Sequence, residues 1–142
     1  SCWWTTNYYH YSLDVWSTGC TMAGMIFRVD TFFKGTDNFD QLIKIVKVLG
    51  EESLHQYVAK YGLTMPKEIR KLMKGNSYER RAWSSFIQEK NQHLVSDDAI
   101  DLLDKMLRYD KNDRIKPRDA MEHKYFDPIR EFVKQQEDRG ED

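Results

Sequence analysis

Apolar residues recur mostly at intervals of three and four along the chain, and no stretch of strand length alternates apolar with polar positions. This spacing is typical of helices that bury one face. The pattern therefore predicts an all-α fold of helices joined by loops. The expected helices cover residues 13–27, 38–49, 54–61, 67–73, 78–88 and 97–108, then a short helix opened by Pro117 and an exposed one over 128–138.

The first of these helices differs from the others because its apolar residues point in every direction around the helix axis. A helix of this kind is expected to be buried on all sides. Ser12 is its candidate N-cap. Ser17, Gly19 and Gly24 are small, and glycine in a helix interior costs about 0.5–1 kcal/mol relative to alanine, which indicates close approach by neighbouring elements.

Two later helices carry clear end signals. Asp37 and Asp40 form a box-like cap before 38–49, and Gly50 ends that helix. Ser96 caps 97–108. Their predicted core faces are Phe39, Leu42, Ile43, Val46 and Leu49 in the first, and Ala99, Ile100, Leu103, Met106 and Leu107 in the second.

Composition narrows the function classes. The 142 residues carry 22 basic and 23 acidic side chains, so no net field favours nucleic acid or an anionic membrane. No apolar run is long enough for a membrane span. Two cysteines are too few for a disulfide framework, so we expect an intracellular location, cytoplasmic, nuclear or both.

Residues that could carry chemistry are scattered. His10, His55, His93 and His123 lack metal-ligand spacing, so surface or structural roles are expected. Cys20 lies within the buried helix and would be a poor nucleophile. The sequence predicts no catalytic, cofactor-binding or metal site in this chain.

Residues 67–81 hold six basic against two acidic side chains. This segment is either a solvated face or a surface for an acidic peptide or phosphate. Its candidate contact residues are Arg70, Lys71, Lys74, Arg80 and Arg81.

Several strings resemble the C-terminal lobe of eukaryotic protein kinases. Residues 11–20, YSLDVWSTGC, resemble the D-x-W-S-x-G signature of its central helix, and LLDKMLRYD at 102–110, then Arg114 and AMEH at 120–123, resemble its end. The strings DNFDQL, KVLG and NQHLVS are similar to the catalytic alpha subunit of casein kinase II. The resemblance implies the helical lower part of that lobe, with about six helices around a central buried helix.

The resemblance also implies a domain layout and a parent activity. It divides the chain into a divergent aromatic segment at 1–10, a helical kinase subdomain at 11–126 and a C-terminal helix and tail at 127–142. The parent would be a serine/threonine kinase that uses ATP or GTP with magnesium, modifies acidic sites and binds a regulatory beta subunit. None of the strings for its Gly-rich loop, catalytic loop or D-F-G metal ligand occurs here, so the chain alone is expected to be inactive and without cofactor.

Four residues correspond to the family's scaffold: Asp14, Trp16, Gly19 and Arg114. In the family the aspartate holds the catalytic loop and the arginine pairs with the glutamate of an A-P-E stretch. Neither partner string occurs here, so for this chain we expect Asp14 to act as a helix-start acid and Arg114 as a solvated surface cation.

The exposed side of the central helix also needs a cover. The candidates are missing kinase regions, a second copy, or the aromatic segment with Trp3, Trp4 and Tyr8, which could otherwise be a loose tail. A non-catalytic interaction module derived from a truncated kinase is the alternative function, and neither nucleic acid nor membrane is an expected partner.

Overall fold

The computed structural model of the chain describes residues 11–140, and every regular element in that range is a helix. This confirms the predicted all-α fold. The α-helices are α1 (Tyr11–Phe27), α2 (Asn38–Leu49), α3 (Glu51–Lys60), α4 (Lys67–Met73), α5 (Asp97–Met106), α6 (Pro117–Met121) and α7 (Asp127–Gly140), with short 3₁₀ turns η1 (Trp83–Phe86), η2 (Gln92–Leu94) and η3 (Lys124–Phe126). The aromatic segment at 1–10 lies outside the described residues.

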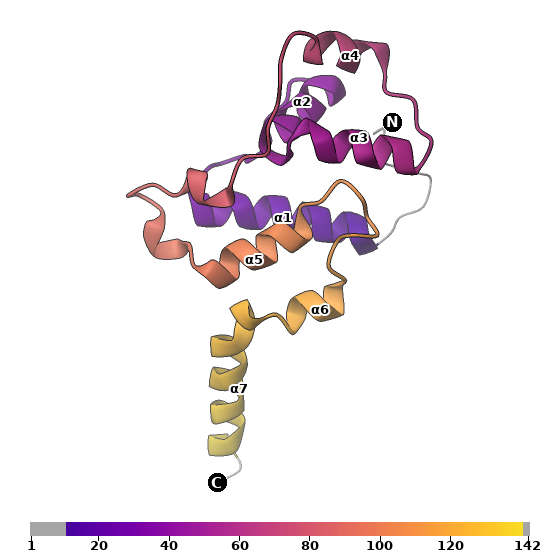
Figure 1. Cartoon of the computed structure of the whole chain (residues 1–142). Coiled ribbons are helices and arrows are strands. Elements are labelled where there is room, and N and C mark those ends of the chain that lie inside the picture. The colour runs from indigo at the N-terminus through magenta and orange to yellow at the C-terminus, as the bar shows by residue number, and fades with distance from the viewer. Residues whose placement is uncertain (1–10, 141–142) are drawn as a thin grey trace.

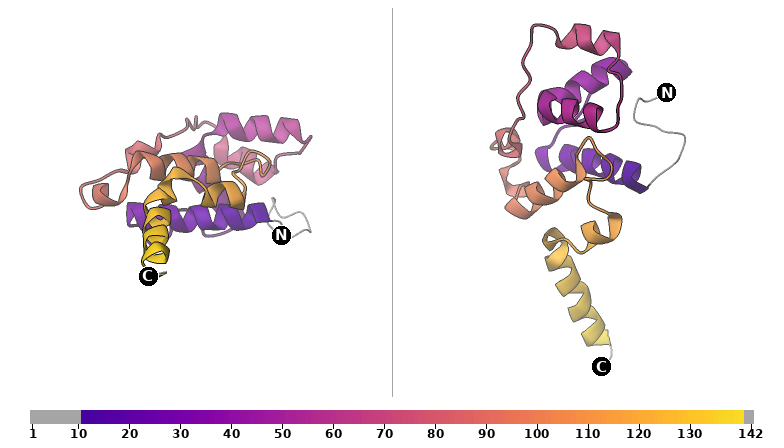
Figure 2. Two further views of the ribbon diagram at one scale, coloured as in Figure 1. Left: turned by 90° about the horizontal axis from the view of Figure 1, so that it is seen from below. Right: turned by 45° about the vertical axis from the view of Figure 1, so that its right-hand side comes forward.

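Helices α1 and α5 pack against each other at the centre of the fold. Helices α2, α3 and α4 lie on one side of this pair, and α6 and α7 lie on the other (Figure 1). The second views show α7 extending away from the remaining helices (Figure 2). The main core joins α1, α2 and α5, with contributions from α3, α4 and η1.

Helix α1 is not buried on every side, contrary to the expectation from its composition. Its buried stripe consists of Ser12, Val15, Gly19, Ala23, Ile26 and Phe27. Thr18 and Thr21 are exposed, and 69% of Met25 is exposed. The described helices therefore leave this outer side of α1 only partly covered.

Two further local predictions are wrong. Ser12 is not an N-cap, because it lies inside α1 and is buried. Phe39 lies outside the core with 39% of its surface exposed, while Ile45 and Val48 are buried instead. The C-terminal half of α2 is covered from two directions because α3 and α4 both pack against it. The caps expected at Asp37 and Ser96 are confirmed, since they accept hydrogen bonds from the backbone N–H of Asp40 and Ala99.

The predicted helix over 78–88 does not form, and only η1 is helical there. The Glu51 backbone N–H donates to the carbonyl of Tyr78, and the Arg81 N–H donates to the carbonyl of Val48. These long-range bonds use backbone groups that a helix would need. The segment is therefore extended until Ala82.

The end of α1 is attached to the following loops by Asn91, which is buried. Its side-chain amide donates to the carbonyls of Phe27 and Phe86, both at 3.0 Å, and its side-chain oxygen accepts from the N–H of Gln88 at 2.7 Å. A buried amide with three satisfied bonds fixes one arrangement of the chain.

The base of α7 is held by polar contacts although none of its residues is buried. Arg130 donates to the carbonyls of Glu122 and His123, at 3.1 and 3.0 Å, and pairs with Asp127. His123 accepts from the Tyr125 N–H through Nδ1, and its Nε2 lies 2.6 Å from Asp101. His123 therefore has the structural role that its isolated position predicts. None of the described helices is long and apolar enough to cross a bilayer.

Candidate functional site

Arg114 joins the loop after α5 to the start of α1. Its guanidinium donates to the carbonyl oxygens of Arg108 at 2.8 Å, Ser12 at 3.0 Å and Tyr109 at 3.2 Å. The expectation of a solvated surface cation is therefore wrong. The side chain is half-buried, and this burial lowers the pKa of Arg114 from its ordinary value, although a guanidinium remains charged.

Trp16 lies beneath this guanidinium. The charged carbon of Arg114 is 5.0 Å from the Trp16 ring centroid, a cation–π distance. The Trp16 ring also stacks on the Phe33 ring, with the centroids 5.9 Å apart and an angle of 9° between the ring planes. Trp16 thus connects Arg114 with the aromatic part of the core.

Gly19 allows α1 to approach α5. A Cβ atom at this position would lie 2.9 Å from Leu107 Cδ2 and 3.1 Å from Met106 Cβ. Leu107 is fully buried, so it has little room to move. The close approach inferred from the small residue is confirmed here. Asp14, the fourth scaffold residue, is exposed in the first turn of α1.

An apolar groove of about 440 Å³ follows the outer side of α1. Met22 and Met25 of α1 line it, together with Leu102 of α5 and Phe126 of η3, and Asp14 is its one charged lining residue among those described. This groove is the exposed side of the central helix for which the sequence predicts a cover.

A polar cleft of about 550 Å³ lies between α3 and the end of α5. Asp110, only 4% exposed, accepts from Lys60 Nζ and from the Tyr61 hydroxyl, both at 2.8 Å. Burial would raise the pKa of Asp110, but the hydrogen bonds from Lys60, the Asn112 N–H and Tyr61 outweigh it and hold that pKa below its usual value.

The other wall of the cleft is organised around Asp104. One oxygen of this carboxylate accepts from Trp83 Nε1 at 3.0 Å and pairs with Arg80, and the other lies 3.4 Å from Arg108. The cleft therefore holds its charges in compensated pairs, and no reactive group is left unpaired at Asp104 or Asp110.

The basic segment at 67–81 does not form one surface of equivalent side chains. Arg80 is paired with Asp104, and the guanidinium of Arg81 lies 4.1 Å from the Phe86 ring centroid. Arg70, Lys71 and Lys74 are exposed on and just after α4, and no ion pair of theirs occurs within residues 11–140. The exposed cations of this segment with neither an ion pair nor a ring contact among the described residues are thus these three and Lys67, all on or just after α4.

The sequence model of the protein kinase domain matches residues 3–126. The chain belongs to the protein kinase family.

Of the four residues expected to act as kinase scaffold, the fold brings two into contact. Arg114 and Trp16 are in contact, and Gly19 lies farther along α1 against Leu107. Asp14 lies on the groove side of α1. The described part of this kinase chain contains no cluster of three or more potential metal-ligating His, Cys, Asp or Glu residues.

Sequence reasoning missed the carboxylates that organise the cleft. Asp104 and Asp110 join residues that are 21 to 50 positions apart, so no local motif identifies them. The available signal was an acid on the predicted buried side of helix 97–108, because a carboxylate in such a position requires a partner.

Proposed function

We propose that this chain is the helical lower part of the C-terminal lobe of a casein kinase II-like serine/threonine kinase, and that the chain alone acts as scaffold without phosphotransfer. The carrying observation is the Arg114 contact set, because it ties the end of the lobe to the start of the central helix through Ser12 and Trp16. The family match and the strings shared with casein kinase II support this assignment.

The parent activity proposed here is transfer of a nucleotide γ-phosphate, from ATP or GTP with magnesium, to serine or threonine in acidic sites. Phosphoryl transfer requires groups that cradle the phosphates, hold the metal and orient the hydroxyl. The 142 residues contain none of the corresponding strings. The residues of this chain would therefore contribute support for that machinery, with a regulatory beta subunit as a partner of the complete enzyme and an intracellular location.

A kinase assay tests the scaffold proposal directly. The purified chain is incubated with radiolabelled ATP, magnesium and an acidic serine peptide, and we expect no incorporation above a protein-free blank. Thermal unfolding in Mg-ATP should give the same midpoint as in magnesium with inorganic phosphate at the same ionic strength. Incorporation, or stabilisation by Mg-ATP beyond that by magnesium with inorganic phosphate, would overturn the proposal.

We also propose that the apolar groove along α1 is covered by the preceding part of the kinase domain in the complete enzyme. The sequence motifs of that part of the kinase domain are absent from this chain. In the groove, Met25 is exposed and Met22 is half-buried. Burying large apolar side chains stabilises by about 1.5–3 kcal/mol each, so the uncovered face is costly to leave in water.

Dye binding tests this cover. The isolated chain should bind a hydrophobic fluorescent dye, and Met25→Lys should reduce the signal. The matched control, Leu72→Lys, changes an exposed apolar residue on α4 away from the groove and should leave the signal nearly unchanged. A dimer in light scattering, or a monomer without dye binding, would instead favour a second copy or the aromatic segment as the cover.

The alternative function is a non-catalytic module that binds acidic partners. The exposed cations on and just after α4 favour it, among them the predicted contact residues Arg70, Lys71 and Lys74. Reversing these three charges should abolish binding of an acidic peptide if the module exists. Arg80 and Arg81 are unsuitable for the same test, because their reversal would also disturb Asp104 and Phe86.

A further inference from the structure

Residues 110–116, in the loop between α5 and α6, separate their charges by sign. The acids, Asp110 and Asp113, line the polar cleft beside α3. The cations, Lys111, Arg114 and Lys116, line a different pocket. The alternation of acidic and basic residues over 110–116 therefore becomes two chemically distinct sides once the loop is folded.

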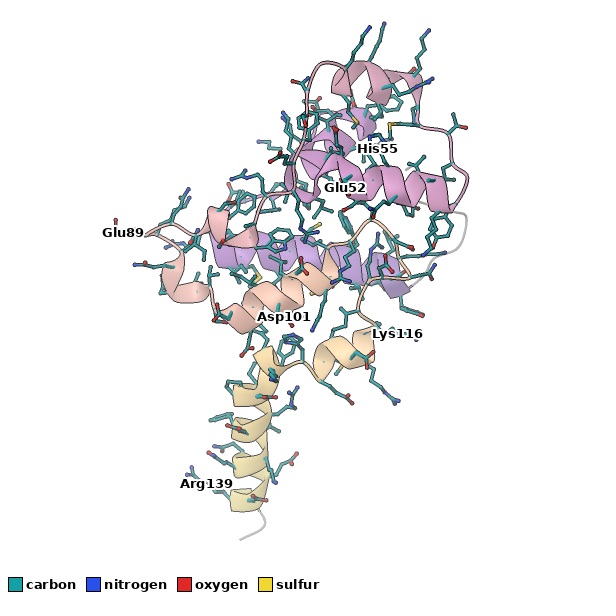
Figure 3. All side chains as sticks on the ribbon, viewed as in Figure 1. Glu52, His55, Glu89, Asp101, Lys116 and Arg139 are labelled. Carbon is teal, nitrogen blue, oxygen red and sulfur yellow. The ribbon has the colours of Figure 1, made fainter. Side chains whose placement is uncertain are left out.

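The second pocket, called here the basic pocket, has a volume of about 230 Å³. Its described lining residues are Tyr11, Ser12, Lys111, Asn112, Arg114, Ile115 and Lys116, which include three cations and no acid. The side-chain view places Lys116 at the loop that leads into α6 (Figure 3).

The charge of Asp110 acts on Arg114, but the hydrogen bonds of the Asp110 carboxylate go to other residues. Asp110 is committed to Lys60, Tyr61 and the Asn112 N–H. The ten residues that precede Tyr11 contain neither aspartate nor glutamate, so that segment supplies no carboxylate. The basic pocket thus retains a concentrated positive charge on a chain whose net charge is −1.

The cations also retain hydrogen-bonding capacity. A guanidinium has five N–H groups, and three bonds of Arg114 go to carbonyl oxygens, which leaves two. No hydrogen bond of the Lys111 or Lys116 ammonium group occurs among the described residues, and each can donate three. Arg114 is held in position by its carbonyl partners, so its charge is preorganised.

We propose that the basic pocket binds a phosphate group. Three convergent cations suit a dianion with three acceptor oxygens better than a singly charged carboxylate, and charge-assisted hydrogen bonds to phosphate are among the strongest that side chains form. The same chemistry serves free inorganic phosphate and the phosphate of a phosphorylated side chain.

Titration of the ¹⁵N-labelled chain with inorganic phosphate at constant ionic strength tests the proposal. The amide signals of Lys111, Asn112 and Lys116 should shift and saturate, and chloride at the same ionic strength should not reproduce the effect. The double variant Lys111→Gln/Lys116→Gln should bind phosphate about tenfold more weakly, as expected for lost charge-assisted bonds.

The matched control is Lys71→Gln/Lys74→Gln, which removes the same net charge at the end of α4 and should leave the affinity within about twofold, since these exposed charges are screened. Equal weakening in both double variants would overturn the proposal, because it would show a nonspecific charge effect. Absence of a saturable shift would also overturn it. Thermal unfolding of each variant verifies that the fold is retained.

A short phosphoserine peptide and its unphosphorylated form identify the source of the phosphate. Tighter binding of the phosphopeptide than of inorganic phosphate would assign the pocket to a phosphorylated protein segment, whereas equal affinity would assign it to the free anion. Equal binding of the two peptides would contradict phosphate recognition.

Discussion

The guanidinium of Arg114 donates a 3.0 Å hydrogen bond to the carbonyl oxygen of Ser12, which lies 102 positions earlier in the chain. This bond joins the beginning and end of the helical core. Ser12 itself is buried in the first turn of α1.

Replacing Arg114 with glutamine should therefore destabilise the whole fold. The change leaves three carbonyl oxygens without their charged donor and removes the cation above Trp16, for an expected loss of about 2–4 kcal/mol. Urea unfolding followed by tryptophan fluorescence measures the loss. Arg118→Gln, on the exposed surface of α6, is the control and should change stability by less than about 0.5 kcal/mol.

Gly19→Ala should destabilise the protein although alanine favours helices. The added methyl would overlap buried Leu107, at an expected cost of about 1–3 kcal/mol, and helix propensity returns about 1 kcal/mol. Thr18→Ala, an exposed position in the same helix, should be neutral or slightly stabilising. Urea unfolding of Gly19→Ala and Thr18→Ala measures the free energy of unfolding of each variant and so separates the packing effect from helix propensity. Equal stability of the two variants would contradict the close contact between Gly19 and Leu107.

Asp110→Asn should remove a pH-dependent part of the stability. The pKa of Asp110 is lowered in the folded chain, so ionised Asp110 stabilises the fold fully above the unfolded pKa of about 3.9, and this contribution disappears as pH falls through the folded pKa. We expect the wild type to exceed the variant by about 1–3 kcal/mol at pH 7, because charge-assisted bonds from Lys60 are lost.

Below about pH 4 the difference between the wild type and Asp110→Asn should shrink. Unfolding midpoints in urea between pH 3 and 7 measure it. Asp97→Asn, at the exposed start of α5, provides a control for a general change of charge. A difference that is constant with pH would show that Asp110 acts through packing alone.

Cys20 should react slowly with thiol reagents while the chain is folded. Burial raises the pKa of the Cys20 thiol to about 11, and only the thiolate reacts. In a Cys2→Ser background at pH 8, labelling should be at least about tenfold slower than in urea-unfolded protein. Comparable rates in the two states would show that the packing of the main core around Cys20 opens readily.

Local patterns predicted α2 and α4 with their observed bounds. For α2 the signals are adjacent in the chain, because Asp37 caps its start and Gly50 follows its end. The same approach failed for 78–88, where the hydrogen-bond partners Val48 and Glu51 lie about 30 positions away in the chain. It also failed for Phe39, since α3 and α4 determine which side of α2 is buried.

The candidate site divides in a similar way. Family-like strings identified Arg114, Trp16 and Gly19, but the contacts of Arg114 with Ser12 and Trp16 exist only in the folded chain. Local composition likewise showed a basic segment at 67–81, and folding engaged Arg80 and Arg81 in other contacts.

By itself the sequence determined the all-helical class, the positions of most helices and the absence of catalytic kinase strings, because these depend on residue identity and short-range periodicity. Only the tertiary structure decided which side of α1 is buried, how Asp104 and Asp110 are paired, and that the cations of 111–116 face one pocket. Burial and charge pairing depend on residues distant in the chain, and their positions are set when the helices pack together.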